Sequence, residues 1–435
     1  MTPGEVPDRI VVHPCGEGGL RGRLRMPGDK SLSHRAYLLG ALTGGPVRVS
    51  GAAQSEDVLH MVTALRVLGV SIGGGPLAAL VEGPPREADD VLDCGNSGTA
   101  LRLLAGVCAT IEGLSVLTGD RYLRARPMAR VAEPLRRMGA RVDGRGGGAL
   151  APLAVRGGHL TALEHELPVA SAQVKSAILL AGLAADGTTR VREPGPSRDH
   201  TERMLRWLGA DVVSGPGEVE ITPGKLTPRP LEVSGDPSSA AFWMVAAAVV
   251  PDSDVVVCDL CLNPTRTGAV DVLRTMGADL DAAVDREWCG EPVGDVTVRA
   301  GELGGAAVAG DLVVRSIDEL PVLAVAGAIG GGISVTDAAE LRVKEVDRID
   351  AVAALLAALG IPVETAPDGF SVRGGQRQTG GRVDSRGDHR IAMAACVAAL
   401  AATDPVMVTG FRAVASSYPT FLADLTALGG RWEPA

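Results

Sequence analysis

Several features that mark other protein classes are scarce or missing in these 435 residues. Aromatic residues make up 3% of the chain, so stacking platforms for single-stranded nucleic acid are not expected. The net charge of −10 also argues against a general nucleic-acid binder, because phosphates attract a basic surface. The longest unbroken apolar stretch, 391–402, is well short of the roughly 18 residues that suggest a membrane span.

Secretion signals are missing as well. The N-terminus, MTPGEVPDRI, has no apolar core of a signal peptide. The seven cysteines are odd in number and scattered, so they predict no disulfide framework. We therefore expect a cytoplasmic protein with neither nucleic acid nor a membrane as partner.

Two cofactor motifs fail at particular positions. Lys30 and Ser31 follow a glycine loosely, as in a phosphate loop, but Asp29 and Leu24 stand where the Walker spacing requires glycine. No GxGxxG follows a predicted strand, so a nicotinamide or flavin site has no support either. These gaps predict a protein without a nucleotide cofactor.

Metal motifs are weak too. The seven histidines show no ligand spacing. Cys258 and Cys261 form one CxxC, which could be redox-active or half of a zinc site. It lies in a strand-like run without a second CxxC, so we interpret the pair as structural and expect no metal.

What the chain does contain is a sixfold repeat. An amphipathic helix ends in Leu-Gly or Met-Gly and is followed by a strand, and successive copies lie 68 to 83 residues apart. The glycine suits the left-handed residue that often closes a helix. The six glycines are Gly69, Gly139, Gly209, Gly277, Gly360 and Gly429.

Each unit of about 70 residues also has an earlier, leading helix and several short strands, which together predict an α/β (α+β) fold. The length favours two domains, with three units in each. We expect one domain over 29–235. We expect a discontinuous second domain over 1–28 and 236–435, in which the strand in RIVVHPCG could complete the C-terminal half.

Polar residues cluster where the leading helices begin. Helix starts expose unpaired N–H groups that suit anions, but Asp, Ser and Asn there are also ordinary N-caps. The residues open to both interpretations are Asp29, Asn96, Ser171, Asp318 and Asp388. Nearby cations, which a cap does not need, favour anion binding; they are Lys30, Arg35, Arg102, Arg126, Lys344, Arg348 and Arg390.

The segment LRVKEVDRID (341–350) is the densest of these clusters. Its charges fit either a solvated, salt-bridged helix start or a functional site. In the second interpretation a pair of cations, Lys344 and Arg348, holds a carboxylate or phosphate, and a carboxyl group between them transfers a proton.

Nine segments together resemble the 5-enolpyruvylshikimate-3-phosphate synthase family. They are PGDKSLSHR, EDVLHMVTALRVLGV, CGNSGTALRLLAG, GDRYLRARPM, LPVASAQVKSA, SRDHTERML, IDELPVLA, LRVKEVDRI and GDHRIAM. They follow the family's order and spacing from about residue 20 onward, and several are closer to its second bacterial class.

The resemblance implies a fold and a reaction. The fold is two inside-out α/β barrel domains, each of three βαβαββ repeats, with the active site in the cleft between them. The reaction is transfer of the enolpyruvyl group of phosphoenolpyruvate to the 5-hydroxyl of shikimate-3-phosphate by addition and elimination. That step belongs to the shikimate pathway toward chorismate and aromatic amino acids. It needs no cofactor, and a monomer is expected.

The resemblance also assigns roles to residues. Asp318 accepts the 5-hydroxyl proton, Glu345 handles the C3 proton, and Lys344 and Lys30 assist catalysis. The residues implied for phosphoenolpyruvate are Lys30, Gly98, Arg126, Gln173, Arg348 and Arg390. Those implied for shikimate-3-phosphate are Lys30, Ser31, Arg35, Ser171, Ala172, Gln173, Ser197, Asp318 and Lys344. Gly98 is also expected to leave room for glyphosate, an inhibitor of the family.

Three positions depart from the family pattern. Ser416 stands where some members carry a lysine that helps bind phosphoenolpyruvate, and the second class commonly lacks it. Glu340 replaces an asparagine of the other class that contacts shikimate-3-phosphate. Tyr122 stands at a position where the family usually carries a smaller residue.

Two alternatives remain open. UDP-N-acetylglucosamine enolpyruvyl transferase shares the fold and reaction type, but it bears a cysteine before its Arg-Pro. Here GDRYLRARP has none, and the nearest cysteine, Cys108, lies on a predicted helix. A non-catalytic sugar-phosphate-binding protein or repeat scaffold would keep the cations but could lose Asp318 and Glu345.

Overall fold

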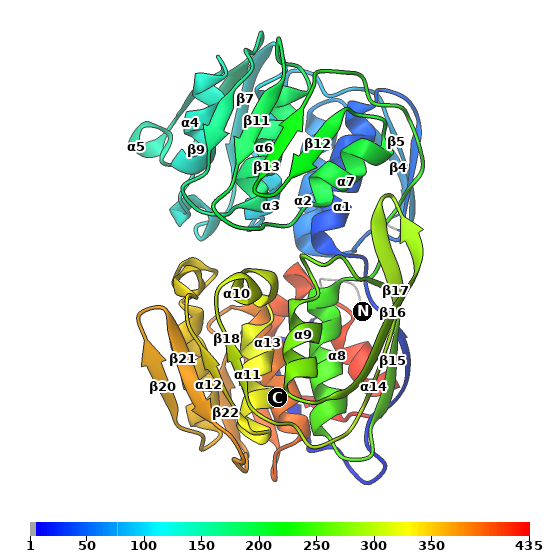
Figure 1. The fold of residues 1–435 in the computed structure, drawn as a ribbon, viewed down its shortest axis with the longest axis vertical. Helices are drawn as coiled ribbons and strands as arrows, with labels where there is room; N and C mark the ends of the chain where they lie inside the picture. The colour runs from blue at the N-terminus through cyan, green and yellow to red at the C-terminus, as the bar shows by residue number, and fades with distance from the viewer. Residues whose placement is uncertain (1–5, 76) are drawn as a thin grey trace. The chain divides into compact units, whose positions relative to one another are not determined.

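The chain forms two compact units in the computed structural model, which describes residues 6–75 and 77–435 (Figure 1). The C-terminal unit contains the residues up to Pro27 together with Gly235–Arg286 and Pro292–Ala435. The N-terminal unit contains Gly28–Ser234 and the short segment Glu287–Glu291.

Three four-stranded sheets build the N-terminal unit: two use consecutive strands, and the first also takes a strand from the end of the unit. The first sheet has the order β14 (Leu231–Glu232), β3 (Val47–Ser50), β5 (Ala78–Glu82) and β4 (Ser71–Gly75). The second has β6 (Leu92–Asp93), β7 (Gly113–Thr118), β9 (Leu150–Gly157) and β8 (Arg141–Gly144). The third has β10 (Glu164–Glu166), β11 (Thr189–Arg192), β13 (Glu218–Ile221) and β12 (Val212–Gly215).

The C-terminal unit repeats this plan with three more sheets. The first has the order β16 (Asp279–Trp288), β17 (Glu291–Arg299), β15 (Asp254–Cys261) and β2 (Arg21–Arg25), and the turn of its β16–β17 hairpin is counted with the N-terminal unit. The second has β18 (Ala306–Val308), β19 (Gly332–Val335), β21 (Gly369–Arg373) and β20 (Val363–Ala366). The third has β22 (Gly381–Asp384), β23 (Val406–Thr409), β1 (Arg9–Val12) and β24 (Trp432–Pro434).

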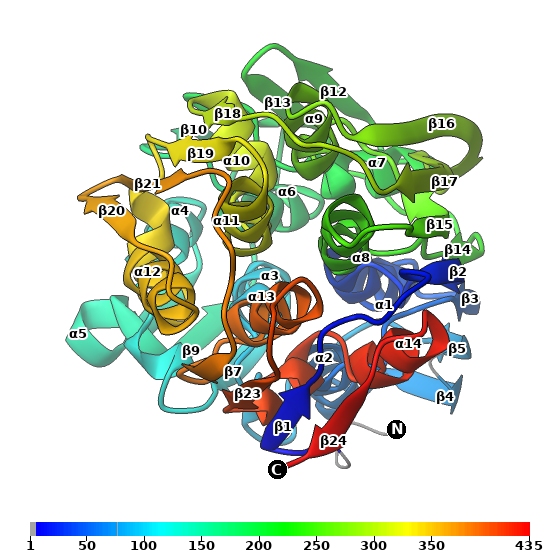
Figure 2. The same ribbon diagram turned by 90° about the horizontal axis from the view of Figure 1, so that it is seen from below.

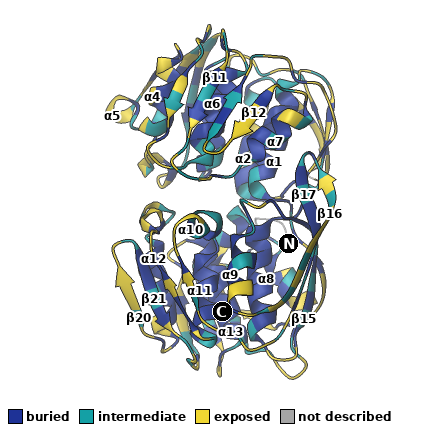
Figure 3. Cartoon of the chain, viewed as in Figure 1, coloured by how far each residue is buried: buried dark blue, intermediate teal, exposed yellow. Residues whose placement is uncertain are grey.

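Helices fill the interior of each unit, and the sheets lie outside them (Figure 2). The inner helices of the N-terminal unit are α1 (Lys30–Leu42), α3 (Gly98–Cys108) and α6 (Ala172–Gly182). Those of the C-terminal unit are α8 (Pro237–Val249), α11 (Leu320–Ile329) and α13 (His389–Leu400), which all contact one another. All 12 residues of α13 are buried, as expected for a helix that is enclosed on every side (Figure 3).

The remaining helices are more exposed and amphipathic. The helices that precede the repeated glycines are α2 (Glu56–Val67), α4 (Ala129–Arg137), α7 (His200–Trp207), α9 (Gly268–Thr275), α12 (Arg348–Ala358) and α14 (Phe421–Ala427). The short helical segments are α5 (Arg145–Gly148), α10 (Asp311–Ser316), η2 (Leu123–Ala125), η3 (Ala339–Val343) and η4 (Phe411–Ser416).

The predicted repeat and fold class are confirmed. All six repeat glycines have positive φ, between 80° and 111°, which is the left-handed conformation predicted for them. The first strand, β1, pairs antiparallel with β23 and β24, so the N-terminal segment completes a sheet of the C-terminal unit. Within the described ranges, no helix combines the length and apolar character that a membrane crossing requires.

Candidate functional site

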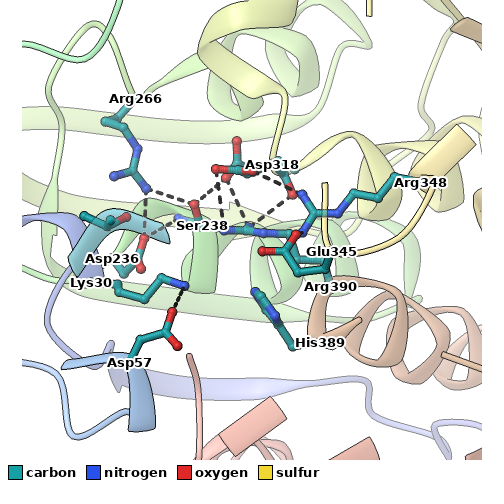
Figure 4. Close-up of polar contacts among 12 residues, drawn as sticks. Lys30, Asp57, Asp236, Ser238, Arg266, Asp318, Glu345, Arg348, His389 and Arg390 are labelled. Carbon is teal, nitrogen blue, oxygen red and sulfur yellow. Dashed lines mark hydrogen bonds and ion pairs between the residues drawn. The ribbon is translucent and has the colours of Figure 1, made fainter. Parts of the chain in front are cut away.

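Arg348, the first residue of α12, is the centre of a buried ion cluster in the C-terminal unit (Figure 4). Its side chain is 1% exposed and donates to three carboxylates. Nε lies 2.8 Å from Asp388 Oδ2, Nη1 lies 3.2 Å from Asp318 Oδ1, and Nη2 lies 2.6 Å from Glu345 Oε2. Burial alone would lower the pKa of Arg348, but the three carboxylates raise it above its ordinary value. A fixed cation therefore stands among three acidic groups.

Arg390, on the first turn of α13, holds Asp318 from a second direction. Its Nη1 donates to the Asp318 backbone oxygen at 3.1 Å, and its Nη2 lies 3.6 Å from Asp318 Oδ2. Figure 4 shows the Asp318 carboxylate within reach of both guanidinium groups. Two preorganised guanidinium groups can bind a carboxylate or a phosphate, while the carboxylate near them can accept a proton.

Lys344 and Glu345 occupy the loop between η3 and α12. Burial lowers the pKa of the Lys344 ammonium, and the nearby Asp318 carboxylate opposes that shift. Lys344 therefore loses its proton more readily than an exposed lysine would. This loop thus places a perturbed amine next to a carboxylate that can transfer a proton.

A buried network supports Arg390 from behind. Glu319 Oε1 lies 3.6 Å from Arg390 Nη1 and accepts a hydrogen bond from the Ser238 hydroxyl. Ser238 in turn accepts from Arg266 Nη2 at 2.9 Å, and the same nitrogen lies 2.9 Å from Asp236 Oδ1. Because hydrogen bonds compensate buried charges only when they are well placed, this network limits the movement of Arg390.

The N-terminal unit carries a second group of cations, beginning at α1. Lys30 Nζ lies 2.9 Å from Asp57 Oδ2. Arg35 is buried and donates to Thr201 Oγ1 at 2.7 Å, to Ser176 Oγ at 2.9 Å and to the Ser31 backbone oxygen at 3.0 Å. Burial lowers the pKa of Arg35 to about 10, which still leaves it charged at neutral pH.

Two further arginines flank the start of α3. Arg126 Nη2 donates to Asn96 Oδ1 at 2.6 Å, and Arg102 Nη1 donates to Gln173 Oε1. A methyl group on Gly98 would lie 2.9 Å from Arg102 Nη1 and 3.2 Å from Arg126 Nη1. Glycine therefore leaves these two guanidinium groups close to the backbone at the helix start.

The start of α6 and the loop after β11 bring further polar groups. Ser171 precedes α6 without capping it, Ala172 is its first residue, and Gln173 Nε2 donates to Thr99 Oγ1 at 3.0 Å. The Ser197 hydroxyl donates to Glu193 Oε2 at 2.5 Å.

The five residues that could be helix caps or ligands fall into two groups in the structure. Asp29 and Asp388 are side-chain N-caps, although Asp388 also binds Arg348. Ser171 makes no cap bond, α3 is capped by Ser97 rather than by Asn96, and α11 begins at Leu320, two residues after Asp318. The leading helices predicted to begin near Asn96 and Asp318 thus begin two residues later. This shift releases Asn96 and Asp318 to bind arginines.

The residues expected to form the site gather in two groups. The C-terminal unit holds Asp318, Lys344, Glu345, Arg348 and Arg390. The N-terminal unit holds Lys30, Ser31, Arg35, Gly98, Arg126, Ser171, Ala172, Gln173 and Ser197. In the C-terminal group Arg348 contacts both Asp318 and Glu345, and Arg390 contacts Asp318. In the N-terminal group Arg35 donates to the Ser31 backbone oxygen.

Sequence reasoning missed several supporting residues. Asp57, Thr201 and Glu319 stand inside quoted motifs, but no local pattern gave them a partner. Glu193 and Arg266 carried no motif, and only the spatial contacts reveal them.

The three departures from the family pattern have different surroundings. Ser416 Oγ donates to the Ala413 backbone oxygen at 2.8 Å and lies 3.3 Å from His389 Nδ1. Glu340 is exposed in η3, and its charge tends to raise the pKa of Lys344. Tyr122 is 47% exposed, and the Arg121 guanidinium lies 4.6 Å from the centre of its ring.

The cysteines do not gather into a reactive site. Cys258 and Cys261 lie on β15 and form no disulfide; Cys258 is at a bulge between Val257 and Leu260, and Cys261 follows it. Cys108 is buried at the end of α3, and burial raises its thiol pKa to about 12. Over residues 6–75 and 77–435, no group of three or more His, Cys, Asp or Glu side chains could hold a metal ion.

Comparison with known proteins agrees with this geometry. The family described as EPSP synthase (3-phosphoshikimate 1-carboxyvinyltransferase) matches residues 15–425. A 3-phosphoshikimate 1-carboxyvinyltransferase from Synechococcus sp. (strain JA-3-3Ab) is 49% identical over 98% of both chains. One from Herpetosiphon aurantiacus is 50% identical over 92% of this chain and 95% of its own.

Solved structures give the same result. The EPSP synthase from Acinetobacter baumannii superimposes with a TM-score of 0.89 at 40% identity, over 98% of this chain and 99% of that one. The enolpyruvyl transferase NikO from Streptomyces tendae has a TM-score of 0.75 at 21% identity, over 98% of this chain and 99% of that one, which shows a shared fold alone.

Proposed function

This chain belongs to the EPSP synthase family, and we propose that it transfers the enolpyruvyl (1-carboxyvinyl) group of phosphoenolpyruvate to the 5-hydroxyl of shikimate-3-phosphate. The observation that carries the proposal is the Asp318 carboxylate held by both Arg348 and Arg390. Two polyanionic substrates require fixed cations, and the attacking hydroxyl requires a base.

The chemistry explains why these residue types are needed. The enol is protonated at C3, the 5-hydroxyl oxygen adds at C2, and the tetrahedral adduct loses phosphate as its carbon–oxygen bond breaks. Addition and elimination both move a proton, so acid and base groups serve twice. Fixed charges stabilise the cation-like centre and the leaving phosphate.

Most of the arginines proposed for the site are assigned to phosphoenolpyruvate. Arg348 and Arg390 would bind it from the C-terminal unit. Lys30 and Arg126 would bind it from the N-terminal unit, with Gln173 beside it. The lack of room for a methyl on Gly98 supports close approach of a ligand to the start of α3.

Shikimate-3-phosphate is assigned to the polar groups of α1, α6 and the loop after β11. Ser31 and Arg35 would bind its carboxylate side, and Lys30 would lie near both substrates. Its phosphate would be bound by Ser171 and Ser197 and by the Ala172 backbone N–H, with Gln173 beside the ring. The buried, charged Arg35 supports an anionic ligand at this place.

Proton transfer is assigned to two carboxylates. Asp318 would accept the 5-hydroxyl proton, and Lys344 would contact that oxygen. Glu345 would deliver the proton to C3 and remove it in the elimination step. The 2.6 Å contact of Glu345 with Arg348 supports a fixed position for this carboxylate.

The enolpyruvyl transferase that acts on UDP-N-acetylglucosamine is the weaker alternative. The buried Cys108, with its raised thiol pKa, is poorly suited to act as that enzyme's cysteine. The presence of both Asp318 and Glu345 likewise disfavours a non-catalytic binding protein.

The setting of the reaction is part of the same proposal. We place the enzyme in the cytoplasm as a monomer of the second bacterial class, with no metal or other cofactor. None of the seven cysteines forms a disulfide, which is the state that a reducing compartment maintains.

Phosphate release from phosphoenolpyruvate by the purified chain tests the proposal. The acceptor is shikimate-3-phosphate in one reaction and UDP-N-acetylglucosamine in another, and a third reaction contains no acceptor. We expect release with shikimate-3-phosphate alone. Release with UDP-N-acetylglucosamine alone would support the UDP-N-acetylglucosamine enolpyruvyl transferase instead. Release with neither acceptor would mean that this family member lacks the proposed activity.

A further inference from the structure

A compact, buried ion cluster in the N-terminal unit lies outside the roles assigned so far. Lys175 on α6 has an ammonium nitrogen 2.6 Å from Glu193 Oε1 and 2.8 Å from Glu202 Oε1. The side chains of Lys175, Glu193 and Glu202 are 4%, 8% and 2% exposed. Glu193 follows β11 and Glu202 lies on α7, so the cluster joins three elements.

Such a cluster is costly to bury. Desolvation lowers the pKa of Lys175, but the two carboxylates more than compensate and raise it, so the ammonium form is retained. One positive and two negative charges remain, and a buried ion pair by itself contributes little net stability. The cluster is therefore better explained by what it holds in place.

The first group that it holds is the Ser197 hydroxyl. Glu193 binds Lys175 through one oxygen and accepts from Ser197 Oγ at 2.5 Å through the other. Ser197 is itself buried, and Glu193 links it directly to the lysine.

The second group is the Arg35 guanidinium. Thr201 and Ser176 precede and follow the cluster residues Glu202 and Lys175 in sequence, and their hydroxyls lie 2.7 Å apart. Arg35 donates to both hydroxyls, at 2.7 and 2.9 Å. The Glu202 charge also favours the protonated form of Arg35. The cluster thus stands directly behind two residues that are proposed to bind the acceptor.

We propose that Lys175, acting through Glu193 and Glu202, is a positioning residue that sets Ser197 and Arg35 for the anionic acceptor. The inference rests on the proposed function of Ser197 and Arg35. Lys175 touches no substrate in this role.

The chemistry of the acceptor explains the arrangement. Phosphate oxygens accept hydrogen bonds, so Ser197 must offer them its hydroxyl proton, which it now gives to Glu193. A hydroxyl that is held by a fixed carboxylate needs only rotation to make this exchange. Lys175 also offsets two negative charges that would otherwise repel an anionic ligand.

Steady-state kinetics of Lys175→Met test the role. We expect the KM for shikimate-3-phosphate to rise by about tenfold or more, the scale of a lost charge-assisted hydrogen bond. The KM for phosphoenolpyruvate and kcat should change less than about threefold. The matched control is Arg190→Met on β11, which breaks ion pairs with Glu164 and Glu220 at a 31% exposed side chain and should change neither KM.

Glu193→Ala serves as a second variant if Lys175→Met does not fold. It leaves Lys175 paired with Glu202, so that one positive charge faces one negative charge, and it removes the carboxylate that accepts from the Ser197 hydroxyl. We combine it with Ser197→Ala in a double-mutant cycle on the shikimate-3-phosphate KM. Positioning through Ser197 requires the double variant to resemble Ser197→Ala alone.

The outcomes distinguish a positioning role of the Lys175 cluster from a purely structural one. Additive effects in the cycle, or a lower Tm with both KM values unchanged, would reduce the cluster to a structural role and overturn the inference. Active wild-type enzyme with that result leaves the proposed function intact. Absence of phosphate release from the wild type would instead overturn the proposed function, and this inference with it.

Discussion

Arg348 donates to Asp318 across 3.2 Å, from the first residue of α12 to the loop before α11. The same guanidinium lies 2.6 Å from Glu345. One buried cation therefore orients both carboxylates to which we assign proton transfer. Because Arg390 approaches Asp318 from a second direction, the geometry of this carboxylate depends on two arginines.

Asp318→Asn should separate binding from proton transfer. The amide keeps one oxygen for the arginines but is not a base, so kcat should fall by more than about a hundredfold. The KM for phosphoenolpyruvate should change only a few-fold. Asp350→Asn, at a 57% exposed carboxylate on the same helix as Arg348, is the control and should retain activity. Near-normal turnover of Asp318→Asn would remove Asp318 from the base role.

Lys344 should control the alkaline side of the pH–rate profile. Burial lowers its pKa below 10.5, and the ammonium is the form assigned to contact the 5-oxygen. As pH rises through this lowered pKa the proton is lost, so kcat/KM should fall. Lys344→Arg keeps the charge and should move that fall to higher pH. The exposed Lys225→Arg should leave the profile unchanged, and an unmoved limb in Lys344→Arg would assign it to another group.

His34 should contribute to instability in acid. It is buried on α1, its Nε2 lies 3.3 Å from the Ser97 hydroxyl that caps α3, and burial lowers its pKa to about 3. The unfolded chain takes up this proton below about pH 6.5 and the folded chain does not. Stability is therefore lost as pH falls from about 6.5 toward 3, by about 1.4 kcal/mol per pH unit.

The comparison that isolates His34 is urea unfolding of wild type and His34→Asn. The difference between their free energies of unfolding should be constant from about pH 7 to 9 and should change by about 1 kcal/mol per unit between about pH 6 and 4. A difference that stays constant over the acidic range would mean that His34 is protonated in the folded state.

Gly98→Ala should weaken the binding of glyphosate more than the binding of phosphoenolpyruvate. The new methyl would approach the Arg102 and Arg126 guanidinium groups to 2.9 and 3.2 Å, and both would have to shift. Crowding of this kind typically costs about 1–3 kcal/mol. The inhibition constant should therefore rise about tenfold more than the substrate KM. Gly215→Ala, whose methyl meets nothing within 4 Å, is the control, and equal inhibition of wild type and Gly98→Ala would refute the expectation.

The sequence by itself determined the repeat, the helix ends and the family. The six glycines predicted left-handed helix ends because that requirement is local: it depends on one residue and its own turn. The family motifs identified the charged residues, but the sequence could not show which of them cap helices and which bind ligands.

Only the tertiary structure decided which of those residues work together. Asp388 caps its helix and binds Arg348 as well, whereas Asp318 lies two residues before α11 and also binds Arg348. Arg35 finds Thr201 across 166 positions of the chain, and Lys175 finds two carboxylates on other elements. Periodicity and capping are short-range properties, but ion-pair partners depend on how distant segments pack, and that packing is set by the whole core.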